Sequence, residues 1–455
     1  MLMRLFRRMR AASPPQRPKA VEVNDRTPPQ LPLRPLMQRP LTQRPLSPGW
    51  DQPLNPRAAR IAPVHENSEA TALPTDDLAT LRGAFTPRQP KRWRHLFVGR
   101  KRQIDRAMAA LEDEHAHIVL FGERGRGKTS LANVLADMAI ERGYTVVHCA
   151  GSADTTLDSI LDHLFSQVSA RQIDAAAANT PVGAARDSSN TGVNRFINRI
   201  RQIRQGQFLL FIDEFDRITD AATHRQLAEA IKNLSDVQAR ITFMIVGVAT
   251  SLEALLGEHP SIQRNILGIH VPLLTSDEAE ASVDIGAAAA NIAFGSEAKA
   301  IICNVARGLP YFLQLFCLYA ARNALKRGSR IVEVGDVVHA AETILEEREM
   351  SLVRAYERAV GGANGPMAVR LLFALADAES DVFGVLGSDT VRAAVKSLDE
   401  AQARPVLDWL CSEQGGAVLQ PTVSPRTQGL SFTNANFRQY VLLRNLLLRR
   451  GPAPR

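Results

Sequence analysis

Hydrophobic and polar positions along the chain predict a sheet of buried strands from about residue 97 onward. Short runs that are apolar throughout alternate with longer segments whose apolar residues recur at helical spacing. Wholly apolar strands separated by helices are typical of a parallel sheet with both faces covered. The pattern therefore predicts an α/β fold in which helices flank a parallel sheet. The expected strands are 117–122, 144–150, 208–213, 241–249 and 268–274.

Two further regions follow the predicted sheet. Residues 275–347 show only helical spacing, and we expect them to form an α-helical lid. Residues 348–455 then give three helices, a hairpin-like pair of short runs and a closing helix over 436–450. Because three helices followed by a hairpin are typical of a winged helix, we expect a C-terminal winged-helix-like domain.

The first 90 residues have a different composition. A five-residue near-repeat, RPLMQ RPLTQ RPLSP at 34–48, places proline at every fifth position. Proline at that spacing blocks helix formation and favours an extended polyproline conformation. We therefore expect residues 1–90 to form a disordered Pro/Arg-rich tail, acting as a spacer or as a ligand for an aromatic groove. Residues 91–274 remain for the core that contains the sheet.

Charge, hydropathy and cysteine usage exclude several classes of protein. The 455-residue chain carries a formal net charge of +8, and much of the basic excess lies before residue 104. Its longest apolar run, 311–321, is far shorter than the roughly 20 residues that cross a bilayer, so we expect no contact with a membrane. The four cysteines are far apart and indicate reduced core residues rather than a metal site or a disulfide framework. Together these features favour a cytoplasmic protein.

The segment FGERGRGKTS at 121–130 has the pattern of a phosphate-binding loop, G-x4-G-K-[ST], with an expected strand before it and an expected helix after it. Glycines let successive backbone N–H groups surround phosphates, the lysine reaches the β and γ oxygens, and the hydroxyl ligates Mg²⁺. The alternative, a plain glycine-rich turn, does not account for the flanking elements. The residues expected to hold ATP here are Gly122, Gly125, Gly127, Lys128, Thr129 and Ser130.

A pair of carboxylates ends the expected strand FLLFID. Asp213 and Glu214 lie where the carboxyl ends of parallel strands face a ligand. We expect Asp213, with Thr129, to orient Mg²⁺, and Glu214 to polarise the attacking water as the general base. Adjacent carboxylates are usually a solvated turn, but the phosphate-binding loop in the same chain favours the functional interpretation.

These motifs resemble those of the AAA+ ATPases, and within them the branch of origin-recognition and replication-initiator ATPases with their bacterial relatives. The resemblance covers about residues 95–347. FVGR at 97–100 looks like the family's N-terminal box, which would place Val98, Gly99 and Arg100 at the adenine pocket. DEFDRI at 213–218 is similar to the initiator branch's form of the acidic motif.

The resemblance implies three further roles. Thr250 or Ser251, after the strand 241–249, matches the polar sensor of the γ-phosphate. Arg264 matches the arginine finger that reaches a neighbouring subunit's nucleotide, although a single arginine near a helix end is as often a surface ion-pair partner. GLP at 308–310 matches the start of the lid helix, with Pro310 near the adenine.

One position departs from the family pattern. Tyr311 stands where the lid helix normally carries a second sensor arginine, directly after the Gly-x-Pro. The missing charge removes a contact to the γ-phosphate, which implies slow hydrolysis or a nucleotide switch. GLP followed by an apolar helix also resembles the STAND signalling ATPases.

Sequence evidence on nucleic acid is divided. The expected third helix of the C-terminal domain, 398–413, is acidic, which argues against base readout in a major groove. The helix 194–205 carries four arginines, but their spacing does not distinguish DNA from a subunit contact. A solvated face explains the basic residues equally well. The arginines that remain for phosphate contacts without sequence preference are Arg426, Arg438, Arg444, Arg449, Arg450 and Arg455.

The favoured hypothesis from the sequence is an AAA+ ATPase that uses ATP and Mg²⁺, forms a homo-oligomer on ATP binding and acts on double-stranded DNA as an initiator-like or transposition-like loader. The alternative is a STAND-like signalling switch, in which the C-terminal domain restrains the ATPase core until a protein partner releases it. A helper subunit that binds ATP without turnover is a third class, since Tyr311 replaces the sensor arginine.

Overall fold

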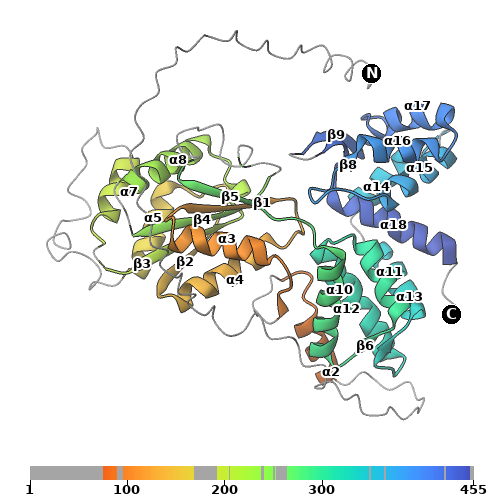
Figure 1. The fold of residues 1–455 in the computed structure, drawn as a ribbon, viewed down its shortest axis with the longest axis horizontal. Helices are drawn as coiled ribbons and strands as arrows, with labels where there is room; N and C mark the ends of the chain where they lie inside the picture. Colours follow the sequence, from red (N-terminus) through yellow and green to blue (C-terminus); the bar gives the residue numbers. More distant parts are fainter. Residues whose placement is uncertain are drawn as a thin grey trace, which may run out of the picture. The chain divides into compact units, whose positions relative to one another are not determined.

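A computed structural model of the chain describes most residues from 75 onward (Figure 1). One compact unit includes all of them. The expected tail over 1–74, the basic run at 91–95, the loop at 170–190 and the sensor candidates Thr250 and Ser251 lie outside the described residues. The described residues are 75–89, 96–168, 192–203, 205–236, 240–249, 252, 264–347, 350–362, 365–424 and 427–450.

Five parallel strands form the sheet, in the order β2-β3-β4-β1-β5. The predicted parallel sheet flanked by helices is confirmed. Two of the five predicted strands, the first and the second, have the predicted bounds. The strands are β1 (His117–Gly122), β2 (Tyr144–Ala150), β3 (Gln207–Asp213), β4 (Ile241–Val248) and β5 (Ile266–His270).

Alternate residues of β3 pack on opposite faces of the sheet, because successive side chains of a strand point to opposite sides. Phe208 and Leu210 join a core with helices α5 (Leu157–Gln167), α7 (Gly192–Ile200) and α8 (Ala221–Asp236). Leu209 and Phe211 join a second core with α3 (Lys101–Glu112) and α4 (Lys128–Glu141). The two helical layers therefore cover both faces of the apolar run 208–212 of this strand (Figure 1).

The fifth strand begins and ends earlier than the predicted 268–274. It pairs with β1 from Ile266, aligned with His117, and ends at His270. Pro272 has no backbone N–H and cannot donate to a strand ladder, which explains the early end. The chain then leaves the sheet, and the Leu274 amide donates to the carbonyl of Gly308 at 2.8 Å.

The region predicted as an α-helical lid is helical, with a small addition. A capping box begins its first helix, since Thr275 accepts from the amide of Glu278 and Glu278 accepts from that of Thr275. The expectation of helices only was wrong in one respect, because Ala293–Phe294 (β6) and Ile331–Val332 (β7) pair in parallel. Two residues each are too few for a period to be recognised in the sequence. The helices are α10 (Ser276–Ala290), α11 (Ser296–Ala306), α12 (Pro310–Lys326) and α13 (Val334–Glu346).

The predicted tail ends earlier than residue 90. Thr75–Ala84 form helix α2, and Leu81 and Phe85 are fully buried in the core of the helical region. A Cβ on Gly286 would lie 2.4 Å from the Phe85 ring, so the glycine lets this ring approach α10 closely. Residues 75–89 are therefore part of the folded protein.

The C-terminal region contains the predicted hairpin and closing helix, but four helices precede the hairpin where three were expected, and a short strand was also missed. β8 (Leu386–Gly387) completes a three-stranded antiparallel sheet with β9 (Leu419–Val423) and β10 (Gln428–Phe432). The apolar core of this region is continuous with that of the helical region. Its assignment as a winged helix stays a prediction. The helices are α14 (Met350–Ala359), α15 (Gly365–Asp377), α16 (Ser388–Lys396), α17 (Glu400–Leu410) and α18 (Ala435–Arg450).

Among the described residues, no helix has the length and apolarity that crossing a membrane requires.

Candidate functional site

The loop between β1 and α4 has the backbone that phosphate binding requires. Gly125 and Gly127 have φ of 81° and 77°, in the left-handed region that favours glycine. Gly127 is the N-cap of α4, so the N-terminus of that helix lies at the loop. Amides at a helix N-terminus, joined by a lysine, make a site for anions.

Lys128 is the buried cation of this loop. Its side chain is 8% exposed, and its ammonium donates to the carbonyl of Glu123 at 2.9 Å. Its pKa is lowered to about 8, mainly by burial and partly by the neighbouring Arg126, while carboxylates led by Asp216 oppose the shift. The charged ammonium is thus destabilised without a ligand, and an anion bound beside it would restore the charged form.

Thr129, in the first turn of α4, is bonded to Asp213, at the end of β3. The threonine hydroxyl donates to Oδ1 of Asp213 at 3.3 Å, although the two residues are far apart in the chain. β3 ends at Asp213, and this carboxylate is 9% exposed. A hydroxyl and one carboxylate, completed by phosphate oxygens and water, fit the way in which Mg²⁺ is held in nucleotide sites. Among the described residues, there is no group of three or more His, Cys, Asp or Glu side chains that could hold a metal ion.

Glu214 follows in a strained turn. Its φ is 52°, and its amide donates to Oδ1 of Asp213 at 2.9 Å. A Cβ on Gly151 would lie 2.5 Å from the Glu214 carbonyl oxygen, so the turn depends on this glycine after β2. The Glu214 carboxylate is about half exposed and forms an ion pair with Arg217 at 2.9 Å. The turn therefore points a solvated carboxylate at the site.

A cavity of about 400 Å³ adjoins these groups. The phosphate-binding loop and the carboxylates of β3 line it, together with residues 96–98 and residues of the helical region. The Tyr311 amide of α12 donates to the Gly125 carbonyl at 3.2 Å, so the helical region contacts the phosphate-binding loop. The lining residues outside the loop and β3 include Leu96, Phe97, Val98, Ser282, Pro310, Tyr311 and Gln314.

Most of the site residues predicted from the sequence line this cavity, and three described ones do not. Gly122 ends β1, and Gly99, at φ 78°, packs on the Glu278 side chain. Arg264 is exposed and precedes β5, so it lies at the amino-terminal ends of the strands, whereas the phosphate-binding loop follows the carboxyl end of β1. The predicted residues that line the cavity are Val98, Arg100, Gly125, Gly127, Lys128, Thr129, Ser130, Asp213, Glu214 and Pro310.

Arg100 has a structural role that the resemblance did not indicate. It is buried, and its guanidinium donates to the carbonyls of Arg126 at 2.5 Å and Pro272 at 3.2 Å. Its amide donates to Glu278 at 2.8 Å. Its pKa is lowered to about 10, mainly by burial and partly by Arg126, while Glu278 opposes the shift. Arg100 therefore fixes the phosphate-binding loop to the start of the helical region.

The sequence analysis missed several residues that line the cavity. Asp216, whose carboxylate accepts from the Val248 amide at 2.7 Å, was visible as the last letter of DEFD. Gln314 was visible as a polar residue inside the apolar run 311–321. Residues 86–89 also line the cavity, but they had been assigned to the tail.

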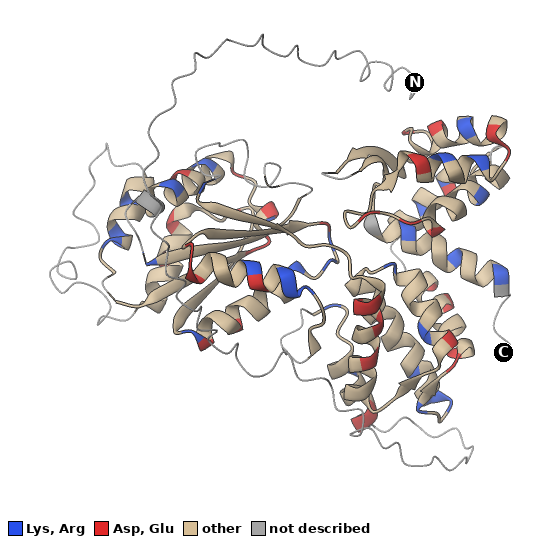
Figure 2. Ribbon diagram, in the orientation of Figure 1, with Lys and Arg blue, Asp and Glu red and all other residues tan. Residues whose placement is uncertain are grey.

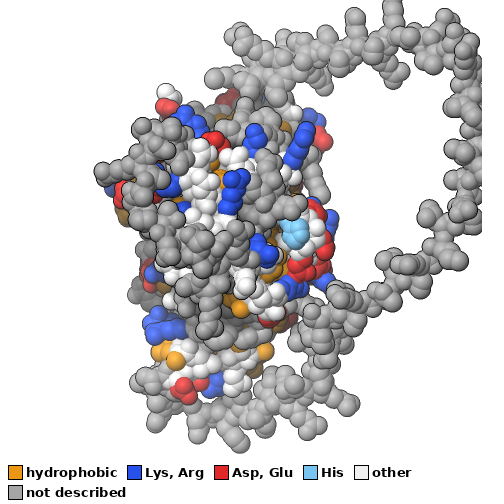
Figure 3. All heavy atoms as spheres, turned by 90° about the vertical axis from the view of Figure 1, so that its left-hand side faces the viewer, with side chains coloured by type: hydrophobic (Ala, Val, Ile, Leu, Met, Phe, Trp, Pro, Cys, Tyr) orange, Lys and Arg blue, Asp and Glu red, His pale blue; other side chains and the backbone are white. Residues whose placement is uncertain are grey.

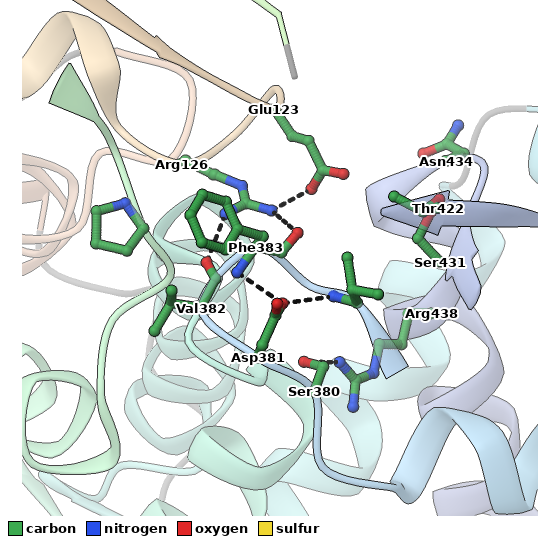
Figure 4. Close-up of polar contacts among 12 residues, drawn as sticks. Glu123, Arg126, Ser380, Asp381, Val382, Phe383, Thr422, Ser431, Asn434 and Arg438 are labelled. Carbon is green, nitrogen blue, oxygen red and sulfur yellow. Dashed lines mark hydrogen bonds and ion pairs between the residues drawn. The ribbon is translucent and has the colours of Figure 1, made fainter. Parts of the chain in front are cut away.

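Arg126 connects the phosphate-binding loop to the C-terminal region (Figure 4). Its side chain is 1% exposed and donates to the carbonyls of Val382 and Phe383, each at 2.9 Å. It also pairs with Glu123 at 2.5 Å. Asp381 holds the C-terminal turn in place, since it accepts from the amides of Phe383 at 2.9 Å and Val385 at 2.8 Å.

Comparison of the structure with solved structures gives distant likenesses. The Aeropyrum pernix ORC1 protein in complex with DNA has 14% identity and a TM-score of 0.42, over 81% of this chain and 97% of that chain. Cdc6p from Pyrobaculum aerophilum has 15% identity and a TM-score of 0.44, over 81% of this chain and 98% of that chain. The RuvB Holliday junction branch migration motor of Thermotoga maritima has 16% identity and a TM-score of 0.42, over 77% of this chain and 97% of that chain. At such values no functional conclusion depends on these likenesses.

Comparison with protein families gives a specific result. Curated proteins do not match the chain. Residues 96–245 match the family model described as the AAA ATPase domain. The matched segment begins at the N-terminal box and ends within β4, and it includes the phosphate-binding loop, Asp213 and Glu214. Residues 96–245 are therefore similar to an AAA ATPase domain.

Proposed function

We propose that this protein binds Mg-ATP in the described cavity, hydrolyses it and couples this cycle to assembly and to action on DNA. The observation that carries nucleotide binding is that three groups line the same cavity. These are the ammonium of Lys128, the hydroxyl of Thr129 and the carboxylate of Asp213. A buried, destabilised ammonium beside a helix N-terminus favours a polyphosphate over a neutral ligand.

For hydrolysis, this chain supplies charge neutralisation and a base. Lys128 stabilises negative charge on the phosphate oxygens, and bound Mg²⁺ contributes charge of the same sign. Glu214 orients the attacking water and accepts its proton, for which its carboxylate must leave the ion pair with Arg217. Because Tyr311 occupies the usual place of a sensor arginine, we expect slow turnover.

Assembly is proposed from the position of Arg264. It lies before the aligned starts of β1 and β5, whereas the phosphate-binding loop follows the end of β1. Six residues of extended strand span roughly 20 Å, so this side chain is far from the nucleotide site of its own chain. An exposed arginine at that edge is available to a neighbouring copy. Arg264→Ala should then lower turnover in assembled protein without changing ATP binding by the monomer.

Action on DNA is proposed from exposed arginines on α18, where Figure 2 shows several basic positions. Arg444 and Arg449 are exposed there. Arg438, expected to contact phosphates, is instead buried and bonded to Ala376 and Ser380, each at 2.9 Å, because its guanidinium closes a turn of the C-terminal region. Arg426 and Arg455 lie outside the described residues, and the side chain of Arg450 is not described.

The arginines of α7 are less available to DNA than the sequence indicated. Arg199 pairs with Asp162 at 2.8 Å and lies over the Phe165 ring, while Arg195 lies 3.6 Å from Asp158. On the described part of the face in Figure 3, basic side chains stand singly among acidic and neutral ones. This side of the domain therefore contributes little to the proposal.

One contact favours the second candidate, a nucleotide-dependent switch. Arg126 of the phosphate-binding loop is bonded to the turn at 381–385, so the C-terminal region touches the loop that would hold the phosphates. A partner that displaced this turn would change the loop directly. That arrangement supports restraint of the ATPase domain by the C-terminal region.

ATP turnover of the full-length protein, with and without double-stranded DNA and at low and moderate salt, tests the two candidates. The Lys128→Ala variant is the blank. Stimulation by DNA that fades with salt supports action on DNA, because phosphate contacts are salt-dependent. Slow turnover that DNA does not change, but that increases in the Arg126→Met variant, supports the switch. Wild-type turnover equal to the blank contradicts the proposed hydrolysis.

A further inference from the structure

Gln314 carries a buried acceptor atom without a partner. Its side chain is 7% exposed, and its amide nitrogen lies 3.3 Å from the hydroxyl of Ser282. Its Oε1 is buried and has no hydrogen-bond partner. Buried polar atoms are nearly always paired, and an orphaned acceptor is costly. Both Gln314 and Ser282 line the cavity described above, so the missing donor belongs to a ligand of that cavity.

The chemistry of this oxygen assigns Gln314 to the base and not to the phosphates, because phosphate oxygens are acceptors and cannot pair with an amide oxygen. Gln314 lies on α12 one turn beyond Pro310, and residues four apart share a face of a helix. Leu96, Phe97 and Val98 line the same cavity. An apolar surround with one aimed polar group is typical of a pocket that selects a planar ring by its edge.

We propose that Gln314, held by Ser282, determines base specificity by accepting a hydrogen bond from the exocyclic amino group of adenine. This inference rests on the proposed function, since it concerns the same nucleotide site. A hypoxanthine or guanine ring has a carbonyl at that position and no donor, so it would leave the Gln314 oxygen unpaired and place two acceptors face to face. A site built for one donor rejects the analogue that lacks it.

Gln439 provides a matched control. It is also a buried glutamine, at 3% exposed, and its Oε1 has no hydrogen-bond partner either. Its amide nitrogen donates to the Ala306 carbonyl at 3.3 Å, and it does not line the cavity. Replacing either glutamine by methionine therefore makes a similar change in a buried side chain, but only one change removes an acceptor from the site.

Binding of ATP and of inosine triphosphate to the full-length protein, measured by calorimetry, tests the inference. We expect the wild type to bind ATP at least roughly tenfold more tightly than inosine triphosphate. The reason is that ATP donates a hydrogen bond to the Gln314 oxygen, whereas inosine triphosphate places a second acceptor against it. Gln314→Met should make the two affinities similar, mainly because ATP binds more weakly. Gln439→Met should retain the difference in affinity between ATP and inosine triphosphate.

Equal affinities in the wild type, or a difference that persists in Gln314→Met, would overturn the inference. If Gln314→Met does not fold, Ser282→Ala provides the second variant, because it releases the amide and should narrow the ATP preference. An unchanged preference in Ser282→Ala then overturns it. The proposed function fails in a different way, when the wild type binds neither nucleotide or when Lys128→Ala binds ATP as the wild type does.

Discussion

Two cations of the same loop, two positions apart, are held in opposite ways. Arg126 is bonded within the protein, since its two terminal nitrogens bond to two carbonyls of the C-terminal region and to Glu123, although its buried Nε has no partner. Lys128 faces the cavity, where its ammonium uses one of its three donors on the Glu123 carbonyl and its pKa is lowered. The first cation therefore belongs to the fold, and the second is held ready for a ligand.

The backbone explains how neighbours come to differ in this way. Gly125 and Gly127 flank Arg126, and both have positive φ, so the chain turns tightly on each side of it. A Cβ on Gly127 would lie 3.1 Å from the guanidinium of Arg100, and one on Gly125 would lie 3.3 Å from Tyr311. A loop this crowded has room for one arginine toward the C-terminal region and one lysine toward the cavity.

Lys128→Ala should have the largest effect on the cavity side. It removes the cation that neutralises the phosphate oxygens, so we expect loss of measurable ATP binding with the fold retained. Calorimetry gives the affinity, and circular dichroism gives the fold. Lys232→Ala, at an exposed position of α8, is the control and should bind as the wild type does. Retained binding in Lys128→Ala would show that the ammonium does not hold the nucleotide.

Glu214→Gln should separate binding from turnover on that same side. The amide keeps the shape of the side chain but accepts no proton, so we expect turnover to fall by roughly 10²- to 10⁴-fold while ATP stays bound. Steady-state turnover and a filter-binding assay measure the two quantities. Glu229→Gln, an exposed change on α8, should alter neither. Unchanged turnover in Glu214→Gln would remove this carboxylate from the proposed mechanism.

Arg126→Met tests the other side of the loop, where stability should change more than ATP affinity. The substitution leaves the carbonyls of Val382 and Phe383 without their donor, and we expect a loss of about 2–3 kcal/mol in the free energy of unfolding. Urea unfolding measures it. The control Arg392→Met breaks the exposed pair with Asp389 and should cost less than about 1 kcal/mol. Equal losses in the two variants would mean that the buried contacts do not stabilise the protein.

Much of the fold and the chemical core of the site could be predicted, because both depend on short-range patterns. Apolar runs located the strands closely, and glycine spacing located the phosphate-binding loop before Lys128. The contact of Arg126 with Val382 could not be predicted, since it joins residues 256 positions apart and nothing in either segment indicates the other.

Two misses had a local signal that was too weak to use. Gln314 interrupts an apolar helical run, and a polar residue on a buried face indicates either a paired core group or a ligand contact. The sequence does not tell these apart. Leu81 and Phe85 lie in the last part of the segment that the proline content assigned to the tail. Only their packing against the helical region shows that the tail ends earlier.

The smallest expected effect is a pH dependence of ATP affinity, which tests whether Lys128 is held ready for a ligand. In the ligand-free chain the Lys128 ammonium has a pKa of about 8, and bound phosphates would raise it. Below pH 8 the group is charged with and without ATP, so its contribution to affinity is constant. Above pH 8 the free chain loses the proton and must regain it on binding, so affinity should fall by up to about tenfold per pH unit.

Calorimetry between pH 7 and 9.5, in buffers of different ionisation enthalpy, measures both the affinity and the proton uptake. Lys128→Arg is the control, because a guanidinium stays charged throughout that range and removes this source of pH dependence. An affinity in the wild type that is constant to pH 9.5, without proton uptake, would mean that Lys128 is fully charged before ATP arrives. The difference between the two cations would then lie in their geometry alone, because both would carry a full charge in the free protein.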